Sequence, residues 1–468
     1  MLSRLVLALV TVMLASGCSG KGGGSDAGPD GADAGPFADP WTVRATSEMV
    51  PVRGYKLQHG IVHNHSPYSH DACDDEPFID GVRNEQCFED LRAGMCETRQ
   101  DFVFLTDHDN LFADYEYPEV LLYAEGDALI ERNAEPVANR VACPGGHEVI
   151  VAAGTESGMM PIGLEHHVGE TIAERHLWYD QIDEEAVRAF QAAGALVFLQ
   201  HTEGWPVETV LGLPIDGIEV YNLHQNMMEN LGAAAELALL LESDPEGLPE
   251  VEVAIIALLQ ENPADLYRWA LAVQQGPMPA VLATDAHRNV FPNPSPDGER
   301  VDSFRRMMHW FSNYVLVPAD AEVDDAVLKE AIGHGRMYGA FEVMGYPVGF
   351  DFRAEASGAV FEMGDSVPAG DGPELVLQIP TIYRLDPALD PPEIVGRILK
   401  AEADGSWSEI DRGTQDLRVG VTAGAYRAEV RMVPVHLLPW LGDKPAYDIP
   451  DKYLTELPWI YANPIYVE

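Results

Sequence analysis

The sequence predicts an α/β protein with an additional all-β region, because the apolar pattern changes character along the chain. From about residue 55 to residue 345, short and nearly continuous apolar runs alternate with helical segments, which is typical of strands buried on both faces of a parallel sheet. The runs span residues 102–105, 149–152, 196–199, 217–220 and 280–283, and residues 184–193 and 323–332 have helical spacing. The length of 468 residues also exceeds one ordinary domain.

The first residues have the features of an export signal. Arg4 supplies a positive charge, and residues 5–14 form an apolar run too short to span a bilayer. Residues 15–18, Ala-Ser-Gly-Cys, resemble a bacterial lipobox. We expect residues 1–17 to be a lipoprotein signal peptide and Cys18 to be acylated; a plain secretory signal is the alternative. The protein would then be exported and lipid-anchored to a bacterial membrane, in the periplasm or on the cell surface.

The composition of the whole chain excludes one class of partner. The chain has 29 Lys and Arg against 76 Asp and Glu, a net charge of −47. Such a surface repels phosphate backbones, so we expect no nucleic-acid partner. Residues 18–45 are rich in Gly, Asp and Ala, and they predict a flexible tether.

Four cysteines remain after Cys18, an even number that favours disulfides in an exported chain. They are Cys73, Cys87, Cys96 and Cys143, and four cysteines allow three pairings. The sequence alone does not choose among these pairings.

Two regions depart from the alternating pattern. Residues 225–275 are rich in Ala, Leu and Glu, and they predict two or three helices inserted between consecutive strands. Residues 346–468 contain short β-rich runs separated by Gly, Pro and Asp, which predict a β-sandwich that resembles an immunoglobulin-like fold. The expected organisation is therefore an α/β unit over residues 46–345 followed by the sandwich.

Potential metal ligands follow the predicted strands where each strand ends. They are His63 and His65, Asp107 and His108, Glu156, His201, and Asp285 and His287. The carboxyl ends of parallel barrel strands meet on one rim, where barrel enzymes have their active sites. Side chains two residues apart on an extended segment point to the same face, so His63 and His65 can chelate one cation. Imidazole together with carboxylate suits Zn²⁺, Mn²⁺ or Fe²⁺.

These motifs resemble, in order, those of the polymerase and histidinol phosphatase (PHP) family over about residues 55–345. The matching segments lie at residues 63–69, 106–108, 154–156, 200–201, 217–222 and 284–287. The resemblance implies a distorted seven-stranded, TIM-like β/α barrel that holds two or three divalent transition-metal ions (Zn, Mn or Fe). The ligands that it implies are His63, His65, His108, Glu156, His201, Asp285 and His287, with Glu156 bridging two ions.

Two positions of the implied ligand set stay open. The family has a His or Asp seven or eight residues after the first His, where this chain has His70 and Asp71. A further His lies between the bridging Glu and the next strand, and both His166 and His167 qualify.

Other polar residues near these motifs have lesser expected roles. Asp109 is a candidate outer acid, and Arg288 is a candidate for meeting an anionic substrate group. Glu219 is expected to be a buried structural carboxylate, and Asp107 to orient its neighbours. No placement distinguishes His59, His147, His176, His224, His309, His334 and His436, which we expect to be ordinary.

The resemblance implies hydrolysis of a small molecule by a metal-bound, metal-bridging hydroxide. Phosphoesters are the leading substrate class, because most of the family acts on them. Carbamates, esters or amides are the alternative, since a β region after the helix end at Gly335 is similar to an exported branch that includes carbamate-cleaving metallohydrolases. A rival from another class is a non-catalytic, metal-holding surface protein whose sandwich binds a protein or glycan partner.

The lipobox gives the first testable prediction. Replacing Cys18 with Ser should move the protein from the membrane fraction to the soluble fraction, because multiple acyl chains attach a protein stably. Fractionation of cells that express each form measures this. Equal membrane attachment of the two forms would show that the lipobox interpretation is wrong.

Overall fold

The computed structural model describes residues 40–230, 249–442 and 453–468. The predicted signal peptide, Cys18 and most of the predicted tether lie outside these residues, as does part of the predicted helical insertion. No helix among the described residues is long and apolar enough to cross a membrane.

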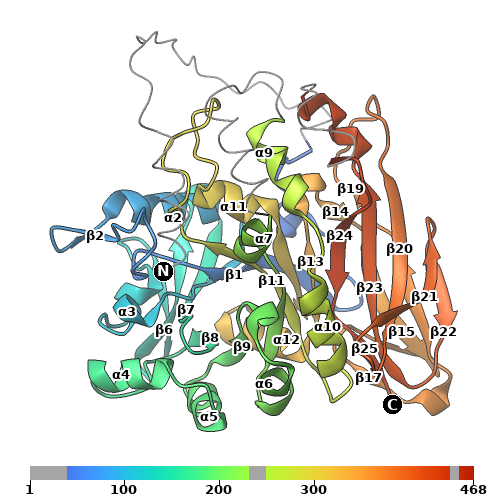
Figure 1. Ribbon diagram of the computed structural model, residues 1–468, viewed down its shortest axis with the longest axis horizontal. Helices are drawn as coiled ribbons and strands as arrows, with labels where there is room; N and C mark the ends of the chain where they lie inside the picture. The colour runs from blue at the N-terminus through green and yellow to red at the C-terminus, as the bar shows by residue number, and fades with distance from the viewer. Residues whose placement is uncertain (1–39, 231–248, 443–452) are drawn as a thin grey trace.

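Seven strands close into a barrel through their pairings. They are drawn in blue to yellow in Figure 1. Their order around the barrel is β1 (Tyr55–Asn64), β4 (Phe102–Phe104), β7 (Glu148–Gly154), β8 (Met160–Leu164), β9 (Leu196–Leu199), β10 (Gly217–Asn222) and β11 (Ala280–Ala286), which pairs with β1 again. All neighbours are parallel except β8, which is antiparallel to both β7 and β9. The predicted α/β class and the seven-stranded barrel are confirmed.

The apolar runs of the sequence form the inner strands of this barrel. Every residue of β4, β10 and β11 is buried, and β7 and β9 are buried except for their first residues. Strands covered on both faces need apolar residues at successive positions, not only at alternate ones. The continuous apolar runs therefore correctly predicted strands that are buried on both faces.

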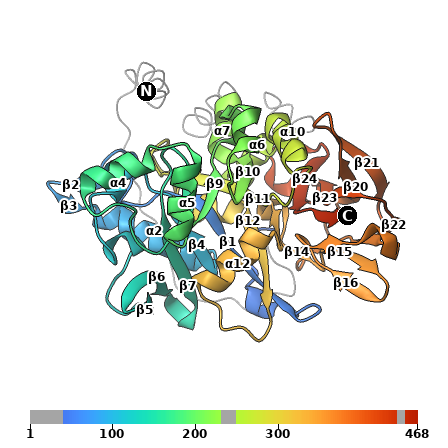
Figure 2. The same cartoon turned by 90° about the horizontal axis from the view of Figure 1, so that it is seen from below.

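Helices and short hairpins surround the barrel strands, as the view from below shows (Figure 2). The helices are α2 (Glu85–Glu97), α3 (Asp109–Phe112), α4 (Ile172–Tyr179), α5 (Glu184–Ala192), α6 (Val207–Gly212), α7 (Leu223–Glu229), α9 (Val251–Ala254), α10 (Pro263–Ala272), α11 (Phe304–Trp310) and α12 (Asp325–His334). The two helices predicted over residues 184–193 and 323–332 correspond to α5 and α12. Asp183 and Asp324 cap them by accepting backbone N–H groups of the first turn. The hairpin of β5 (Ala128–Arg132) and β6 (Glu135–Ala142) extends β7, and β2 (Phe78–Ile79) pairs with β3 (Val82–Arg83).

The C-terminal strands form two layers, as predicted for a β-sandwich (Figure 1, orange and red). One layer contains β20 (Glu393–Ala401), β21 (Trp407–Gly413), β23 (Gly424–Val433), β24 (Leu457–Ala462), β25 (Ile465–Val467) and β17 (Ser366–Val367). The other contains β15 (Asp351–Ala356), β16 (Ala359–Phe361), β18 (Glu374–Gln378) and β22 (Leu417–Gly420). A small pair, β14 (Pro347–Val348) and β19 (Thr381–Ile382), lies beside them. Gly396 of the first layer faces Leu377 of the second so closely that an added Cβ would lie 2.9 Å from it.

The sandwich is joined to the barrel by backbone pairing. The first half of β1 pairs with β12 (Ser312–Pro318), which pairs with β13 (Met337–Ala340), and β13 pairs in turn with β24. The predicted division between residues 345 and 346 therefore runs through a continuous sheet. Helix α10 of the insertion also contacts the sandwich, where the Trp407 indole donates to the Leu266 carbonyl at 2.8 Å.

The four cysteines form two disulfides, Cys73–Cys87 and Cys96–Cys143. The structure thus agrees with the preference for disulfides and selects one of the three pairings. Cys96–Cys143 connects the end of α2 to the segment before β7.

Loss of each disulfide should destabilise the fold according to the length of chain that it closes. The sequence separations of 14 and 47 residues correspond to losses of about 3 and about 4 kcal/mol of unfolding free energy in a chain-entropy model. Urea denaturation of the Cys73→Ser/Cys87→Ser and Cys96→Ser/Cys143→Ser proteins measures both. A Cys96→Ser/Cys143→Ser protein as stable as the wild type would contradict the pairing.

Candidate metal centre

The ends of the barrel strands bring the sequence-predicted ligands to one rim. His63 is the last residue but one of β1, Glu156 follows β7, His201 follows β9, and Asp285 lies at the end of β11. The six parallel strands all present their carboxyl ends on this side, so their terminal side chains converge. The convergence that strand placement predicted is present in the structure.

Four side chains form what we name the first donor set: His63, His65, Glu156 and Asp285. Nε2 of His63 lies 3.2 Å from Nε2 of His65, 3.0 Å from Oε2 of Glu156 and 3.2 Å from Oδ1 of Asp285. Nε2 of His65 lies 3.2 and 3.3 Å from the same two oxygens. Ligand atoms around a tetrahedral zinc ion are about 3.3 Å apart, because Zn–N and Zn–O bonds are about 2.0–2.1 Å. The spacing of the first donor set fits a tetrahedrally bound cation.

The Nδ1 atoms of the two histidines form hydrogen bonds outside this set, so that their Nε2 atoms point into it. Nδ1 of His63 donates to Oε1 of Glu219 at 2.5 Å, and Nδ1 of His65 donates to Oγ of Ser69 at 3.1 Å. Such contacts fix the ring orientation and leave Nε2 for a metal. Oδ1 of Asp285 is buried and has no hydrogen-bond partner among the described residues. A buried carboxylate oxygen that accepts no hydrogen bond is costly, and a bound cation would satisfy it.

Asp71, His108 and His287 form the second donor set beside the first. Oδ2 of Asp71 lies 3.3 Å from Nε2 of His108 and 3.3 Å from Nε2 of His287. Nδ1 of each ring is bonded to a backbone carbonyl, that of Glu156 at 2.6 Å for His108 and that of Asp285 at 3.0 Å for His287. These three side chains, with His65 close by, lie close enough together to hold a second ion.

The two positions that the sequence left open have different outcomes. Asp71 lies in the second donor set, whereas the His70 side chain is 51% exposed and lies in no group of potential ligands among the described residues. Neither His166 nor His167 reaches the centre, which corrects the expectation that one of them is a ligand. His166 is exposed, and both ring nitrogens of buried His167 are bonded, to the Tyr179 hydroxyl and the Tyr115 carbonyl, each at 2.8 Å.

The histidine that sequence reasoning missed is His224. Its Nδ1 lies 3.5 Å from Oδ2 of Asp285, and it forms a potential ligand group with Asp285 and His287. His224 comes two residues after the end of β10, so the strand-end placement that identified the other ligands also applied to it. The segment that resembles the family here ends at residue 222, before His224.

Three further carboxylates near the centre form hydrogen bonds with neighbouring residues. Asp107 accepts from the Ser66 backbone N–H at 2.5 Å and from the Ser66 hydroxyl at 2.7 Å, and it thereby fixes the loop after His65. Glu219 is fully buried against His63, as expected of a structural carboxylate. Asp109 bonds to His176 and Ser157 at 2.7 and 2.8 Å and lies in no ligand group among the described residues.

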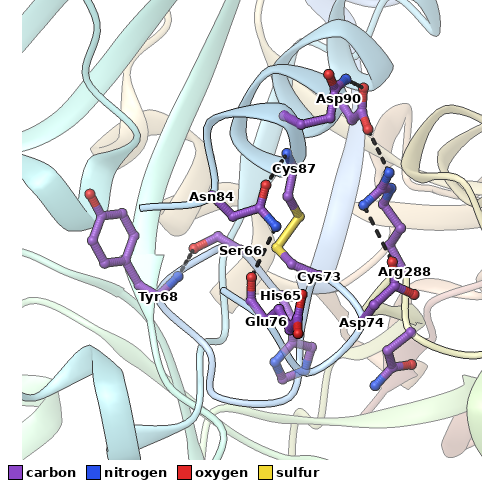
Figure 3. The surroundings of a disulfide bond; sticks show 12 residues. His65, Ser66, Tyr68, Cys73, Asp74, Glu76, Asn84, Cys87, Asp90 and Arg288 are labelled. Atoms are coloured by element: carbon purple, nitrogen blue, oxygen red, sulfur yellow. Dashed lines mark hydrogen bonds and ion pairs between the residues drawn. A yellow bond between two sulfur atoms is a disulfide. The ribbon is translucent and has the colours of Figure 1, made fainter. Parts of the chain in front are cut away.

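Arg288 is directed away from the centre. Figure 3 shows its guanidinium between Asp90 and Asp74, at 2.8 and 3.8 Å, beside the Cys73–Cys87 disulfide. The backbone N–H of Cys73 also donates to the His287 carbonyl at 3.0 Å. The disulfide and the ion pairs thus hold the loop that carries Asp71 against the strand end that carries His287. Arg288 balances acidic neighbours here, in place of the candidate role of binding an anionic substrate.

The electrostatics of the centre favour cation binding. Burial alone would raise the pKa values of Glu156 and Asp285, but the charge of the His63 ring lowers both well below their usual range. Burial opposes protonation of His201 and His108, yet their hydrogen bonds to Glu156 and Asp71 raise the pKa values to about 10 and about 9. Bound cations must displace these protons, so cation affinity increases with pH.

Backbone strain also concentrates on this rim. His63, His201 and Asp285 have φ values of 68°, 46° and 51°, in the left-handed region that non-glycine residues rarely adopt. Such conformations cost on the order of 1 kcal/mol or more each, and they persist where the surrounding structure requires them. Here they turn three strand-end side chains into one cluster.

Comparison with known proteins gives one structural neighbour. No family model and no curated protein match the chain. A similar solved structure is that of a two-domain protein from Bacteroides vulgatus, which contains a predicted PHP-like metal-dependent phosphoesterase. The similarity covers 86% of this chain and 97% of that one, at 15% identity and a TM-score of 0.32. In this chain, the closed barrel and the converging His, Asp and Glu side chains are the two features that the PHP resemblance implies.

Removal of two ligands from the first donor set should empty it. We expect at least two transition-metal ions per wild-type chain after reconstitution with Mn²⁺ or Zn²⁺, and at least one fewer in His63→Ala/His65→Ala. The variant His166→Ala removes an exposed histidine outside the centre. It serves as the control and should have the wild-type metal content. Elemental analysis measures all three proteins. Fewer than one ion in the wild type would overturn the metal-centre assignment.

Proposed function

We propose that the protein is a metal-dependent hydrolase and that its substrates are phosphoesters. The observation that supports this most is that the two oxygens of the Glu156 carboxylate contact different histidines. Oε2 lies 3.0 Å from Nε2 of His63, whereas Oε1 lies 2.9 Å from Nε2 of His201. One buried carboxylate can therefore hold two cations next to each other.

Paired cations suit displacement at phosphorus. When bound, two divalent cations lower the pKa of water and stabilise both the attacking and the leaving oxygen. The chain's own residues position this chemistry: His63 and His65 are oriented through Glu219 and Ser69, and Glu156 is fixed between them and His201. Because Arg288 is paired with Asp90, the cations and not this arginine would carry the charge that attracts a phosphoryl group.

An exported location agrees with the two disulfides, which persist in oxidising compartments. We propose that acylated Cys18 anchors the protein and that residues 18–45 separate the barrel from the bilayer. Membership of the exported branch that includes carbamate-cleaving enzymes is the alternative to the phosphoesterase proposal. If the protein belongs to that branch, the bond that it hydrolyses would be a carbamate and not a phosphoester.

The decisive experiment combines a substrate panel with one substitution. Wild-type protein loaded with Mn²⁺ or Zn²⁺ should hydrolyse an aryl phosphate monoester or diester, and Glu156→Ala should reduce that rate by orders of magnitude because the shared ligand is lost. The exposed carboxylate variant Glu170→Ala is the control and should retain the wild-type rate. Circular dichroism should show the same fold for all three.

Each other outcome has a defined meaning. Cleavage of aryl acetates or carbamates without any phosphoester would replace the phosphoesterase proposal with the carbamate, ester or amide alternative. Absence of cleavage across both panels, with bound metal verified, would favour a non-catalytic metal-holding surface protein.

A further inference from the structure

The loop that carries Asp71 is held differently from the other members of the second donor set. His108 and His287 follow the barrel strands β4 and β11, whereas Asp71 lies in the loop between β1 and β2. Residues 73–75 of this loop have φ values of 59°, 62° and 60°, three successive positions in the left-handed region. Non-glycine residues keep such conformations where the surrounding structure requires them. The loop therefore depends on contacts outside itself for its shape.

We propose that the Cys73–Cys87 disulfide is the positioning element of the second donor set, so that this set binds its cation tightly only after the two thiols are oxidised. The proposal rests on the metal-dependent centre proposed above. It adds a redox condition to that centre: one cation binds whether or not the disulfide is formed, and its neighbour requires the disulfide.

The disulfide joins the loop to a helix that is fixed from its other side. Cys87 lies in the first turn of α2, and both cysteines are buried. Helix α2 approaches α11 so closely that a Cβ at Gly94 would lie 2.8 Å from a backbone nitrogen of α11. Asn84 caps α2 by accepting the Cys87 N–H at 3.1 Å, and it donates to the Glu76 carbonyl of the loop at 2.9 Å (Figure 3). The disulfide therefore connects the loop to a stationary anchor.

Backbone hydrogen bonds extend this restraint from the disulfide to the ligands. The Cys73 N–H donates to the His287 carbonyl at 3.0 Å, and the next N–H donates to the next carbonyl of that segment at 3.1 Å. The Asn289 side chain donates to the Asp71 carbonyl at 2.7 Å. These contacts hold Oδ2 of Asp71 at 3.3 Å from Nε2 of His287. Outer contacts that orient metal ligands typically contribute about 10–100-fold in metal affinity.

The ion pairs around the loop are weaker restraints than the disulfide. Arg300 pairs with Asp74 at 2.6 Å, and Arg288 pairs with Asp90 of α2 at 2.8 Å. The side chains of Asp74 and Asp90 are 38% and 34% exposed. Ion pairs with such access to solvent contribute little to stability. The covalent link between two buried sulfurs is therefore the contact whose loss should release the loop.

Formation of the link is a thiol–disulfide exchange. The two cysteine thiols lose two electrons and two protons and form one S–S bond, while the S–S bond of a disulfide-bonded oxidant is cleaved to two thiols. Thiols stay reduced in the cytosol, and disulfides form in oxidising compartments. Before export, the chain therefore holds the cation of the first donor set and binds its neighbour weakly. A hydrolase that needs paired cations is then inactive until it has been exported.

Bound zinc tests the proposal without reference to activity. Full-length protein loaded with Zn²⁺ is dialysed against buffers of stepwise lower free Zn²⁺ and analysed for metal. In Cys73→Ser/Cys87→Ser, one ion should leave at a free Zn²⁺ concentration at least about tenfold higher than in the wild type, and the other at the wild-type concentration. Because the disulfide acts through Asp71, its removal in an Asp71→Asn background should shift that midpoint by less than about twofold.

The second disulfide provides a matched control. Cys96–Cys143 closes 47 residues against 14 for Cys73–Cys87, so its loss should destabilise the fold more. It joins the end of α2 to the segment before β7, away from the Asp71 loop. Cys96→Ser/Cys143→Ser should therefore keep both ions at the wild-type midpoints. General destabilisation would affect the two variants in the opposite order.

Each remaining result decides between the proposals. If the serine pair does not fold, Cys73→Ala/Cys87→Ala takes its place, because it puts no hydroxyl group into the buried sites. Unchanged midpoints in the folded variant, or equal weakening of both ions, would overturn this inference. If one midpoint shifts as expected and no substrate is cleaved, only the proposed hydrolase fails. If phosphoesters are cleaved and no midpoint shifts, only this inference fails.

Discussion

Two carboxylates are buried side by side at the rim of the barrel. The rest of the centre has to compensate their negative charge. Glu156 and Asp285 are almost completely buried, and an unpaired buried carboxylate costs several kcal/mol. Histidines from the ends of β1, β4, β9 and β10 surround them. The rings of His63, His65 and His108 are each held by a further hydrogen bond. The disulfide at Cys73, the ion pairs of Arg288 and the strained strand ends all serve to keep this charge compensated in one geometry.

The sequence was most informative where a single rule of geometry applied. Parallel strands end on one rim, so the residues after each apolar run were expected to meet, and the first donor set shows them 3.0 to 3.3 Å apart. This rule could not choose between His70 and Asp71, because both residues lie in a loop and not at a strand end. The contact that favours Asp71 is a hydrogen bond from the Ser69 hydroxyl, at 2.8 Å, which directs the Asp71 carboxylate inward.

Other features depended on contacts between residues distant in sequence. The antiparallel strand β8 is short and apolar like its parallel neighbours, so composition alone did not reveal its direction. His167 resembled a ligand in sequence, but its environment is a set of aromatic side chains and two hydrogen bonds that occupy both nitrogens. The passage of the sheet from the barrel into the sandwich was also unpredicted, because β13 and β24 are separated by more than a hundred residues of chain.

This shared sheet has a mechanical consequence. A ladder of backbone hydrogen bonds runs from β1 through β12, β13 and β24, so no flexible joint separates the layer that supports the metal centre from the sandwich. The two regions cannot close on each other like the lobes of a hinged enzyme. Access to the rim must instead be controlled by local movements of loops and short helices, and unfolding of the sandwich would expose the edge of β13 and fray the barrel from that side.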